Sequence, residues 1–275
     1  MQLDIYQVDA FSNRQFRGNA AAVVPLTSWL DDALLRNIAQ ENNLSETAFV
    51  VELQPGHFFI RWFSPLTEID FCGHATLAAA FVLFARQPAL TSIQFSTTVV
   101  GDLTVCQQQD WLQMSFPQRP ALAVDEVPPA LLQGLLTKAG LPAPIQILRS
   151  AQAWLVVFAE AATVQQLTPD FALLKQLGPW DVVVTAPGTG VADGQYDFIS
   201  RYFWPANGGE EDPVTGSIHA ALTPYWAAAL GKAELLAWQA SKRGGELRCV
   251  LQQERVLVSG QAVLYLQGKL LLQPC

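Results

Sequence analysis

The sequence is poor in basic residues and lacks any long hydrophobic run. It holds 16 Lys and Arg against 24 Asp and Glu, a formal net charge of -8, and its longest basic cluster is Lys242-Arg243. This charge balance gives no electrostatic basis for binding nucleic acid or an anionic membrane surface. The longest apolar runs, such as residues 77–85, fall well short of the roughly 20 residues that a membrane-spanning helix needs. We therefore expect no nucleic-acid and no membrane partner.

Paired cysteines are also absent. Cys72, Cys106, Cys249 and Cys275 stand far apart, without a C-x-x-C pair, which argues against a zinc site or a disulfide framework. The first residues, MQLDIYQVDAF, contain no basic segment ahead of an apolar stretch, so they do not resemble a secretory signal and the cytoplasm is the expected compartment. With 275 residues, 51% hydrophobic and 15% charged, the chain can bury a large core in one large domain or two ordinary ones.

An internal repeat is present. The segment FFIRWFSP at 58–65 matches FISRYFWP at 198–205, with Arg61 aligned on Arg201 at a spacing of 140. Further on, with a three-residue insertion, Cys72-Gly73-His74 matches Thr215-Gly216-Ser217, and Ala/Leu-rich segments follow both. Upstream, DDALLRNIA at 31–39 resembles DFALLKQLG at 170–178 in the apolar spacing of an amphipathic helix. Two similar halves therefore follow each other.

Each half consists of short runs with alternating apolar positions around one or two helical segments, a pattern that favours strands curling around a helix. The predicted fold is α+β, with two pseudo-symmetric lobes and a cleft between them that suits a small ligand. The proline-rich segment FPQRPALAVDEVPPALL marks the break. We expect an N-terminal lobe over 1–118, to which a C-terminal strand at about 265–275 is a candidate to return, and a C-terminal lobe over 119–275.

The two glycine-containing turns suggest an anion site. A glycine directly before a helix lets backbone N–H groups approach a ligand, and the helix dipole favours an anion there. Gly73 and Gly216 are thus candidates, with Ser217, for clamping a carboxylate. The alternative is that Thr76 or Ser217 merely caps its helix. Neither turn has the G-x-x-x-x-G-K-[ST] pattern of a phosphate loop.

Three side chains near these turns and at a strand start are candidate catalysts. His74 lies in the first turn and can relay a proton or donate to an anionic oxygen. Asp212 precedes the second turn much as Asp70 precedes the first. Glu46 stands at the start of a run that otherwise resembles a buried strand, between Leu44 and Ala48. Partial desolvation there would disfavour its charged form and suit it to acid–base chemistry. A solvent-facing strand end is the alternative for Glu46, and a solvated loop for Asp212.

Four phrases in register, spanning nearly the whole chain, resemble the PhzF family of phenazine-biosynthesis-like isomerases. They are VDAFSNRQFRGNAAAVV, NLSETAFVV, RWFSPLTEIDFCGHATLAAAF and GGEEDPVTGSIHAAL. The resemblance implies a diaminopimelate epimerase-like fold, in which each lobe is a curved, mostly antiparallel sheet around a central helix. It also implies a homodimer and a reaction that needs no cofactor and no metal. In one place the sequence departs from the family: Ala20 stands where GNP is common, which affects a turn rather than the chemistry.

The family's catalytic glutamate, which moves a proton on a dihydro-hydroxyanthranilate in the phenazine pathway, matches Glu46. The resemblance likewise carries a histidine, an aspartate and a serine onto His74, Asp212 and Ser217. Related epimerases use two opposed thiols, but here only Cys72 remains, because the second position holds Thr215. A threonine hydroxyl has far too high a pKa to deprotonate a carbon acid unaided. Cys72 is therefore expected to be chemically silent.

Three functions remain open at this point. The first is an isomerase in which Glu46 shuttles a proton on a small carboxylate-bearing substrate, with His74 and Asp212 orienting or sharing it. The second is a racemase or epimerase that uses the one thiol, Cys72, together with Glu46. The third is a non-catalytic protein that binds a small molecule. The substrate itself is not identified by the sequence, because a fold and its site chemistry do not fix the walls of a pocket.

Overall fold

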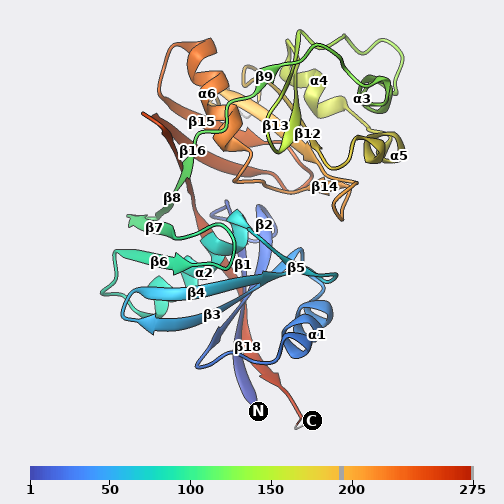
Figure 1. Ribbon diagram of the computed structural model, residues 1–275. Helices are drawn as coiled ribbons and strands as arrows, with labels where there is room; N and C mark the ends of the chain where they lie inside the picture. Colours follow the sequence, from blue (N-terminus) through green and yellow to red (C-terminus); the bar gives the residue numbers. More distant parts are fainter. Residues whose placement is uncertain (192–194, 274–275) are drawn as a thin grey trace. The chain divides into compact units, whose positions relative to one another are not determined.

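The computed structural model describes residues 1–191 and 195–273, and the chain divides into two compact units (Figure 1). The first unit comprises residues 1–115 and the segment from Ser259 onward, and the second comprises residues 116–258. The chain passes from one to the other within β8 (Trp111–Pro117) and β17 (Arg255–Gly260). The expected boundary at 118 and the expected returning strand at about 265 lie a few residues beyond these points. In the part of the chain described, no helix is long and apolar enough to cross a membrane.

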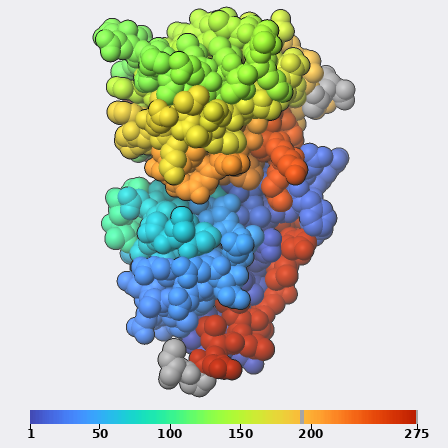
Figure 2. Space-filling view, turned by 90° about the vertical axis from the view of Figure 1, so that its right-hand side faces the viewer, coloured from blue at the N-terminus to red at the C-terminus, as the bar shows by residue number. Residues whose placement is uncertain are grey.

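The first unit is a curved, mostly antiparallel sheet with a central helix. Its strands pair in the order β18–β1–β2–β3–β4–β6–β7–β8, and β2/β3 and β4/β6 are the parallel pairs. Strand β18 lies along β1, so the two ends of the chain run side by side (Figures 1 and 2). The other elements are β1 (Gln2–Ala10), β2 (Asn19–Leu26), α1 (Asp32–Asn42), β3 (Glu46–Gln54), β4 (His57–Phe63), β5 (Glu68–Ile69), α2 (Gly73–Arg86), β6 (Ser92–Ser96), β7 (Leu103–Gln108) and β18 (Ala262–Leu271).

The second unit repeats this pairing pattern. Strand β11 pairs parallel with β12, β12 antiparallel with β13, and β13 parallel with β15, as β2, β3, β4 and β6 do in the first unit. Its elements are β9 (Leu122–Ala123), α3 (Pro129–Leu135), β10 (Gln146–Arg149), β11 (Ala153–Val157), α4 (Ala161–Gln166), α5 (Phe171–Leu174), η1 (Lys175–Leu177), β12 (Asp181–Pro187), β13 (Phe198–Phe203), β14 (Glu211–Asp212), α6 (His219–Leu230), β15 (Glu234–Gln239) and β16 (Gly245–Gln252). The internal repeat of the sequence is thus a repeat of topology.

The alternation of side chains along β3 decides where Glu46 lies. Phe49 and Val51 join a buried cluster with Leu35 and Ile38 of α1 on one face of the sheet. Successive side chains of a strand point to opposite faces, so Glu46, with an even number, faces away from α1. The opposite face is covered by α2, which packs on β1, β2 and β3. The ordinary alternation of side chains along β3 therefore places the Glu46 side chain on the face of the sheet that the central helix covers.

One expected helix is shorter than its pattern indicated. The segment 170–178 forms only α5, followed by the 3₁₀ turn η1. Asp170 caps α5 by accepting hydrogen bonds from the N–H groups of Ala172 and Leu173. The segment then ends at Gly178-Pro179, because a proline disfavours helical geometry in the residue before it and cannot donate a helical hydrogen bond.

Candidate active site

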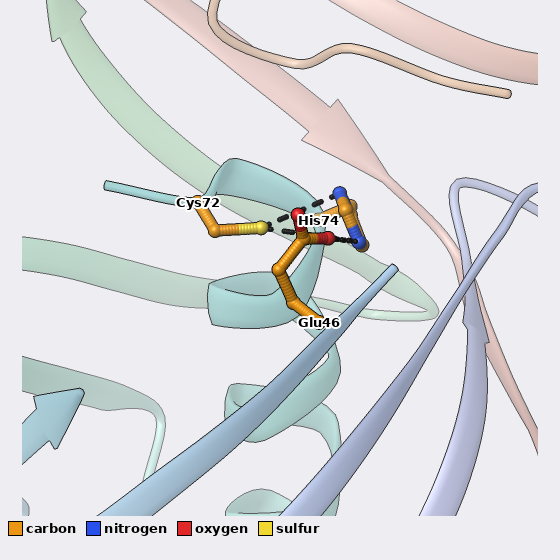
Figure 3. A group of neighbouring side chains, drawn as sticks. All are labelled: Glu46, Cys72 and His74. Atoms are coloured by element: carbon orange, nitrogen blue, oxygen red, sulfur yellow. Dashed lines mark hydrogen bonds and ion pairs between the residues drawn. The ribbon is translucent and has the colours of Figure 1, made fainter. Parts of the chain in front are cut away.

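The core of the candidate site is a close pair between Glu46, the first residue of β3, and His74, the second residue of α2. The His74 Nε2 atom lies 2.8 Å from Oε2 of Glu46 (Figure 3). Both residues are only 5% exposed. A carboxylate and an imidazole held this close, away from water, form a charged pair that can share and transfer a proton.

Two further side chains contact the same imidazole. The Cys72 sulfur lies 3.4 Å from Nδ1 of His74, and the Asn19 amide nitrogen lies 3.1 Å from the same atom. Asn19 begins β2 directly after Gly18, whose φ is +64° and whose Cβ, if it had one, would lie 2.1 Å from the carbonyl oxygen of Ala10. Only glycine fits there without strain. The turn at Gly18 therefore places Asn19 against the site, a role that the sequence pattern did not reveal.

The pKa values of this group follow from burial and charge. Burial on its own lowers the pKa of His74, but the electrostatic interactions and hydrogen bonds with Cys72 and Glu46 outweigh it and raise that pKa well above 6.5. Burial raises the pKa of the Cys72 thiol to about 11. Near neutral pH the thiol therefore keeps its proton, and the imidazole of His74 is protonated.

The second unit carries another predicted residue, Asp212, at the end of β14. Its Oδ2 atom accepts a hydrogen bond from the hydroxyl of Thr215. The fully buried Gln239 holds the same loop, because its Oε1 accepts from the Thr215 N–H at 2.8 Å and its Nε2 donates to the Asp212 carbonyl at 2.8 Å. Sequence reasoning missed Gln239, which is simply the polar end of an apolar strand. The hydroxyl of Thr215 is occupied by this contact rather than poised as a base.

At the first glycine turn, α2 begins at Gly73 and the side chain of Cys72 makes no capping hydrogen bond. Thr76, the alternative cap, donates its hydroxyl to the Cys72 carbonyl oxygen at 2.6 Å instead. A side chain that donates to a carbonyl does not satisfy the N–H groups at the start of the helix. The capping explanation for Thr76 is therefore wrong.

The second glycine turn differs from the expectation. Helix α6 begins at His219 and not directly after Gly216, because the N–H groups of His219 and Ala220 bond to the carbonyls of Gly216 and Ser217, three residues back, in a tighter turn. Ser217 makes no capping bond either. Its Oγ accepts a hydrogen bond from Nε2 of Gln152 at 3.0 Å.

The strand register corrects one part of the repeat. Ile69 pairs with Trp62 in the first unit, and Asp212 pairs with Tyr202 in the second. Trp62 and Tyr202 follow Arg61 and Arg201 and so hold equivalent places. Asp212 therefore corresponds to Ile69, and the expected match to Asp70 is wrong, because the three-residue insertion lies in the loop before β14.

The register also identifies the counterpart of Glu46. Glu46 opens β3 opposite Ala21, and Asp181 opens β12 opposite Ala153. The Asp181 Oδ2 atom accepts a hydrogen bond from the Tyr202 hydroxyl at 2.5 Å, and burial raises the pKa of this carboxyl group. The sequence signal that could have revealed Asp181 is an acid at the start of an apolar run, because DVVVTAP begins with an acid as ETAFVV does. No histidine stands near it in the repeat, since Ser217 takes the place of His74.

Comparison with known proteins agrees with this architecture. A hydroxyproline epimerase from Agrobacterium vitis, solved with trans-4-hydroxy-L-proline, matches with a TM-score of 0.56 at 10% identity, over 98% of this chain and 92% of that one. The fold is therefore of the epimerase-like class. A PhzF-family protein from Enterococcus faecalis matches with a TM-score of 0.90 and 40% identity, over 99% of this chain and all (100%) of the other.

Sequence comparison defines the family more closely. A Pseudomonas aeruginosa protein described as an uncharacterised isomerase is 46% identical over 271 residues, which cover 98% of this chain and 99% of that protein. The model of the phenazine biosynthesis-like family, PhzC-PhzF, matches residues 8–268. The chain belongs to this family, and the resemblance and fold expected from the sequence are confirmed.

Proposed function

We propose that the protein is a cofactor-independent isomerase that moves a proton on a small carboxylate-bearing substrate. The observation that carries this proposal is the buried pair of Glu46 and His74, 2.8 Å apart at the start of the central helix. The name of the Pseudomonas relative, an isomerase, is consistent with it. Isomerisation by proton transfer requires one group that can accept a proton from carbon and return it to a second position, and Glu46 has that capacity.

In the proposed mechanism Glu46 removes a proton from a substrate carbon and becomes neutral. The electron pair left behind delocalises toward the substrate's unsaturated system or carboxylate. The protonated His74 stabilises this new negative charge, because a preoriented cation in a site with little water interacts strongly with charge that develops during reaction. Glu46 then gives a proton, which can exchange with solvent while it resides on the carboxyl group, to another carbon, so the substrate keeps its number of protons and the site returns to its starting state.

Each unit, taken by itself, has donors that can bind an anionic group. Gly73 begins α2, whose first N–H groups have no side-chain cap, and such groups attract anions. In the second unit, Ser217 Oγ already accepts from Gln152, so its own hydrogen is available to a ligand oxygen. Gly216 contributes a backbone without a side chain to the same loop, and the roles of Gly216 and Asp212 stay predictions.

The test begins with ligands, because the substrate is not known. Small carboxylates are screened for those that raise the melting temperature with concentration. Each ligand found is then incubated with the protein in deuterated water, and incorporation of deuterium at carbon is measured by NMR. Exchange in the wild type and its loss in Glu46→Gln support the proposal. A ligand that binds without any exchange supports the non-catalytic binding protein instead.

A second candidate is a racemase or epimerase that uses Cys72. The contact that favours it is the 3.4 Å separation between the Cys72 sulfur and His74 Nδ1. Against it stand the pKa of about 11 for this thiol and the absence of a thiol at Thr215. If Cys72→Ala folds and loses exchange while Glu46→Gln keeps it, the thiol mechanism replaces ours.

The homodimer and the cytoplasmic location stay predictions. Sedimentation of the purified protein checks whether it is a dimer.

A further inference from the structure

The side chains of Glu46, Cys72 and His74 offer three different metal ligands at one point. We infer that they form a binding site for one zinc-like divalent cation, with the carboxylate oxygen, the thiolate sulfur and the imidazole Nε2 as ligands (Figure 3). One ligand atom from each residue lies within 4.8 Å of the other two, and the three residues are only 5–6% exposed. Among residues 1–191 and 195–273 this is the one group of three such side chains.

The ligand atoms are close enough for one cation, and a rotation of the Cys72 side chain brings them to tetrahedral spacing. Zinc bonds of about 2.3 Å to sulfur and about 2.0–2.2 Å to nitrogen or oxygen place neighbouring ligands roughly 3.4–3.6 Å apart. The observed separations are 3.8 Å between Cys72 Sγ and His74 Nε2, and 2.8 Å between Nε2 and Glu46 Oε2. Because the sulfur lies nearer to Nδ1, at 3.4 Å, than to Nε2, the Cys72 side chain must rotate to place Sγ in front of the Nε2 lone pair when the cation binds. Two of the three ligands lie at the fixed start of α2, two residues apart.

Asn19 suits the orientation that a metal-bound histidine needs. For Nε2 to bind a cation, the proton must sit on Nδ1, and metal-bound histidines usually donate that N–H to an oxygen. The Asn19 amide lies 3.1 Å from Nδ1. When its amide is turned over, the same side chain presents its carbonyl oxygen to Nδ1–H. The site thus has an orienting partner in addition to its three ligands.

Charge and ligand type select the cation. One carboxylate and one thiolate neutralise a divalent ion, so the occupied site buries no net charge, which is the condition under which buried ions are tolerated. On binding, the proton of the Cys72 thiol and one imidazole proton of His74 pass to water. A mixed set of sulfur, nitrogen and oxygen suits zinc or cobalt, whereas magnesium and calcium prefer oxygen alone.

The second unit provides an internal comparison. The positions equivalent to Glu46, Cys72 and His74 are Asp181, Thr215 and Ser217, which include neither an imidazole nor a thiol. The sequence pattern that argued against zinc, the lack of a C-x-x-C pair, concerns sites built from paired cysteines. This site is assembled from β3 and the start of α2 and carries no such spacing.

A bound cation would occupy the Glu46 carboxylate that the proposed function assigns to proton transfer. If that function is correct, zinc therefore inhibits isomerisation reversibly and a chelator restores it. This consequence rests on the proposed function, but the site itself does not. Metal binding is measured without a substrate, so each idea can fail while the other stands.

The test uses chelator-treated, full-length protein titrated with zinc chloride by calorimetry and with cobalt chloride by absorption spectroscopy. We expect one zinc per chain, and a thiolate-to-cobalt charge-transfer band that reports the sulfur ligand. Cys72→Ala should lose the band and bind zinc at least about 100-fold more weakly, since even an outer-shell partner is worth about 10–100-fold. Asn19→Ala should fall in that smaller range.

Matched controls are available on other strands of the same unit. Cys106→Ala on β7 and His57→Gln on β4 remove a thiol and an imidazole that lie outside the cluster, and both should bind zinc like the wild type. Absence of stoichiometric binding, a cobalt spectrum without the thiolate band, or loss of binding in a control variant instead of Cys72→Ala would each overturn the inference. Should Cys72→Ala fail to fold, the wild-type cobalt spectrum and Cys72→Ser decide.

Discussion

The substitution Glu46→Gln tests the proposed reaction most directly. It keeps the size and shape of the side chain but removes its capacity to accept a proton. Glu46 is 5% exposed and its oxygen lies 2.8 Å from His74 Nε2, so water has little room to replace it as the base. Loss of a positioned general base costs a factor of about 10² to 10⁴ in rate, and we expect deuterium exchange into the ligand to fall by that factor.

The same change has a calculable effect on stability. Removing one partner of a buried ion pair costs about 3–5 kcal/mol when the other charge remains. In the variant His74 no longer has Glu46 to hold its proton, so above about pH 6.5 it can become neutral and avoid part of that cost. The loss of unfolding free energy should therefore be largest at acidic pH and shrink as pH rises.

Exchange is followed by NMR on the wild type, on Glu46→Gln and on Glu52→Gln, a control at the exposed end of the same strand. Unfolding by urea at several pH values confirms that each variant is folded. Exchange in folded Glu46→Gln within a few-fold of the wild type would show that another group moves the proton, and the mechanism proposed above would have to be abandoned.

Three further predictions follow from the surroundings of this pair. Because the pKa of His74 is raised in the folded state, the native protein holds more protons than the unfolded chain above pH 6.5. Its unfolding free energy should therefore fall by up to about 1.4 kcal/mol per pH unit from about pH 6.5 upward. An equal dependence of unfolding free energy on pH in His74→Gln and the wild type would contradict this. Iodoacetamide should label Cys106 before Cys72 at about pH 8, as read by mass spectrometry. Burial raises the pKa of Cys72 to about 11, so its labelling should become about tenfold faster per pH unit up to that value. Equal labelling rates of Cys72 and Cys106 at that pH would indicate that Cys72 is an activated thiol. Gln239→Ala should lose about 1–3 kcal/mol on urea unfolding, because it leaves the buried Thr215 N–H without its acceptor, whereas the exposed Gln253→Ala should lose almost nothing.

Much of the architecture was readable from local patterns. The short runs TAFVVEL and HFFIRWF, rich in β-branched and aromatic residues, predicted β3 and β4. The repeat around Arg61 and Arg201 predicted two halves of one topology, since both copies place their arginine on the same strand of the same pairing order. Four phrases in register were enough to identify the family and, through it, Glu46 and His74 as candidates.

Other features depended on how strands and loops pack. The packing of α2 on β2 brings Asn19 to His74 across 55 positions of sequence, and no local pattern encodes that contact. The strand register shows that Asp212 matches Ile69, as the alignment of Cys72 on Thr215 also requires, since Ile69 and Asp212 each stand three residues ahead of that aligned pair.

The sequence by itself determined which residue types were available for chemistry: one glutamate, one thiol and one histidine near the strand and turn that carry them. Only the tertiary structure decided that these three side chains meet. The raised pKa values of Cys72 and His74 follow from that meeting, because burial and neighbouring charge act through space rather than along the chain. The same holds for the second unit, where an equivalent acid, Asp181, is instead bonded to the hydroxyl of Tyr202.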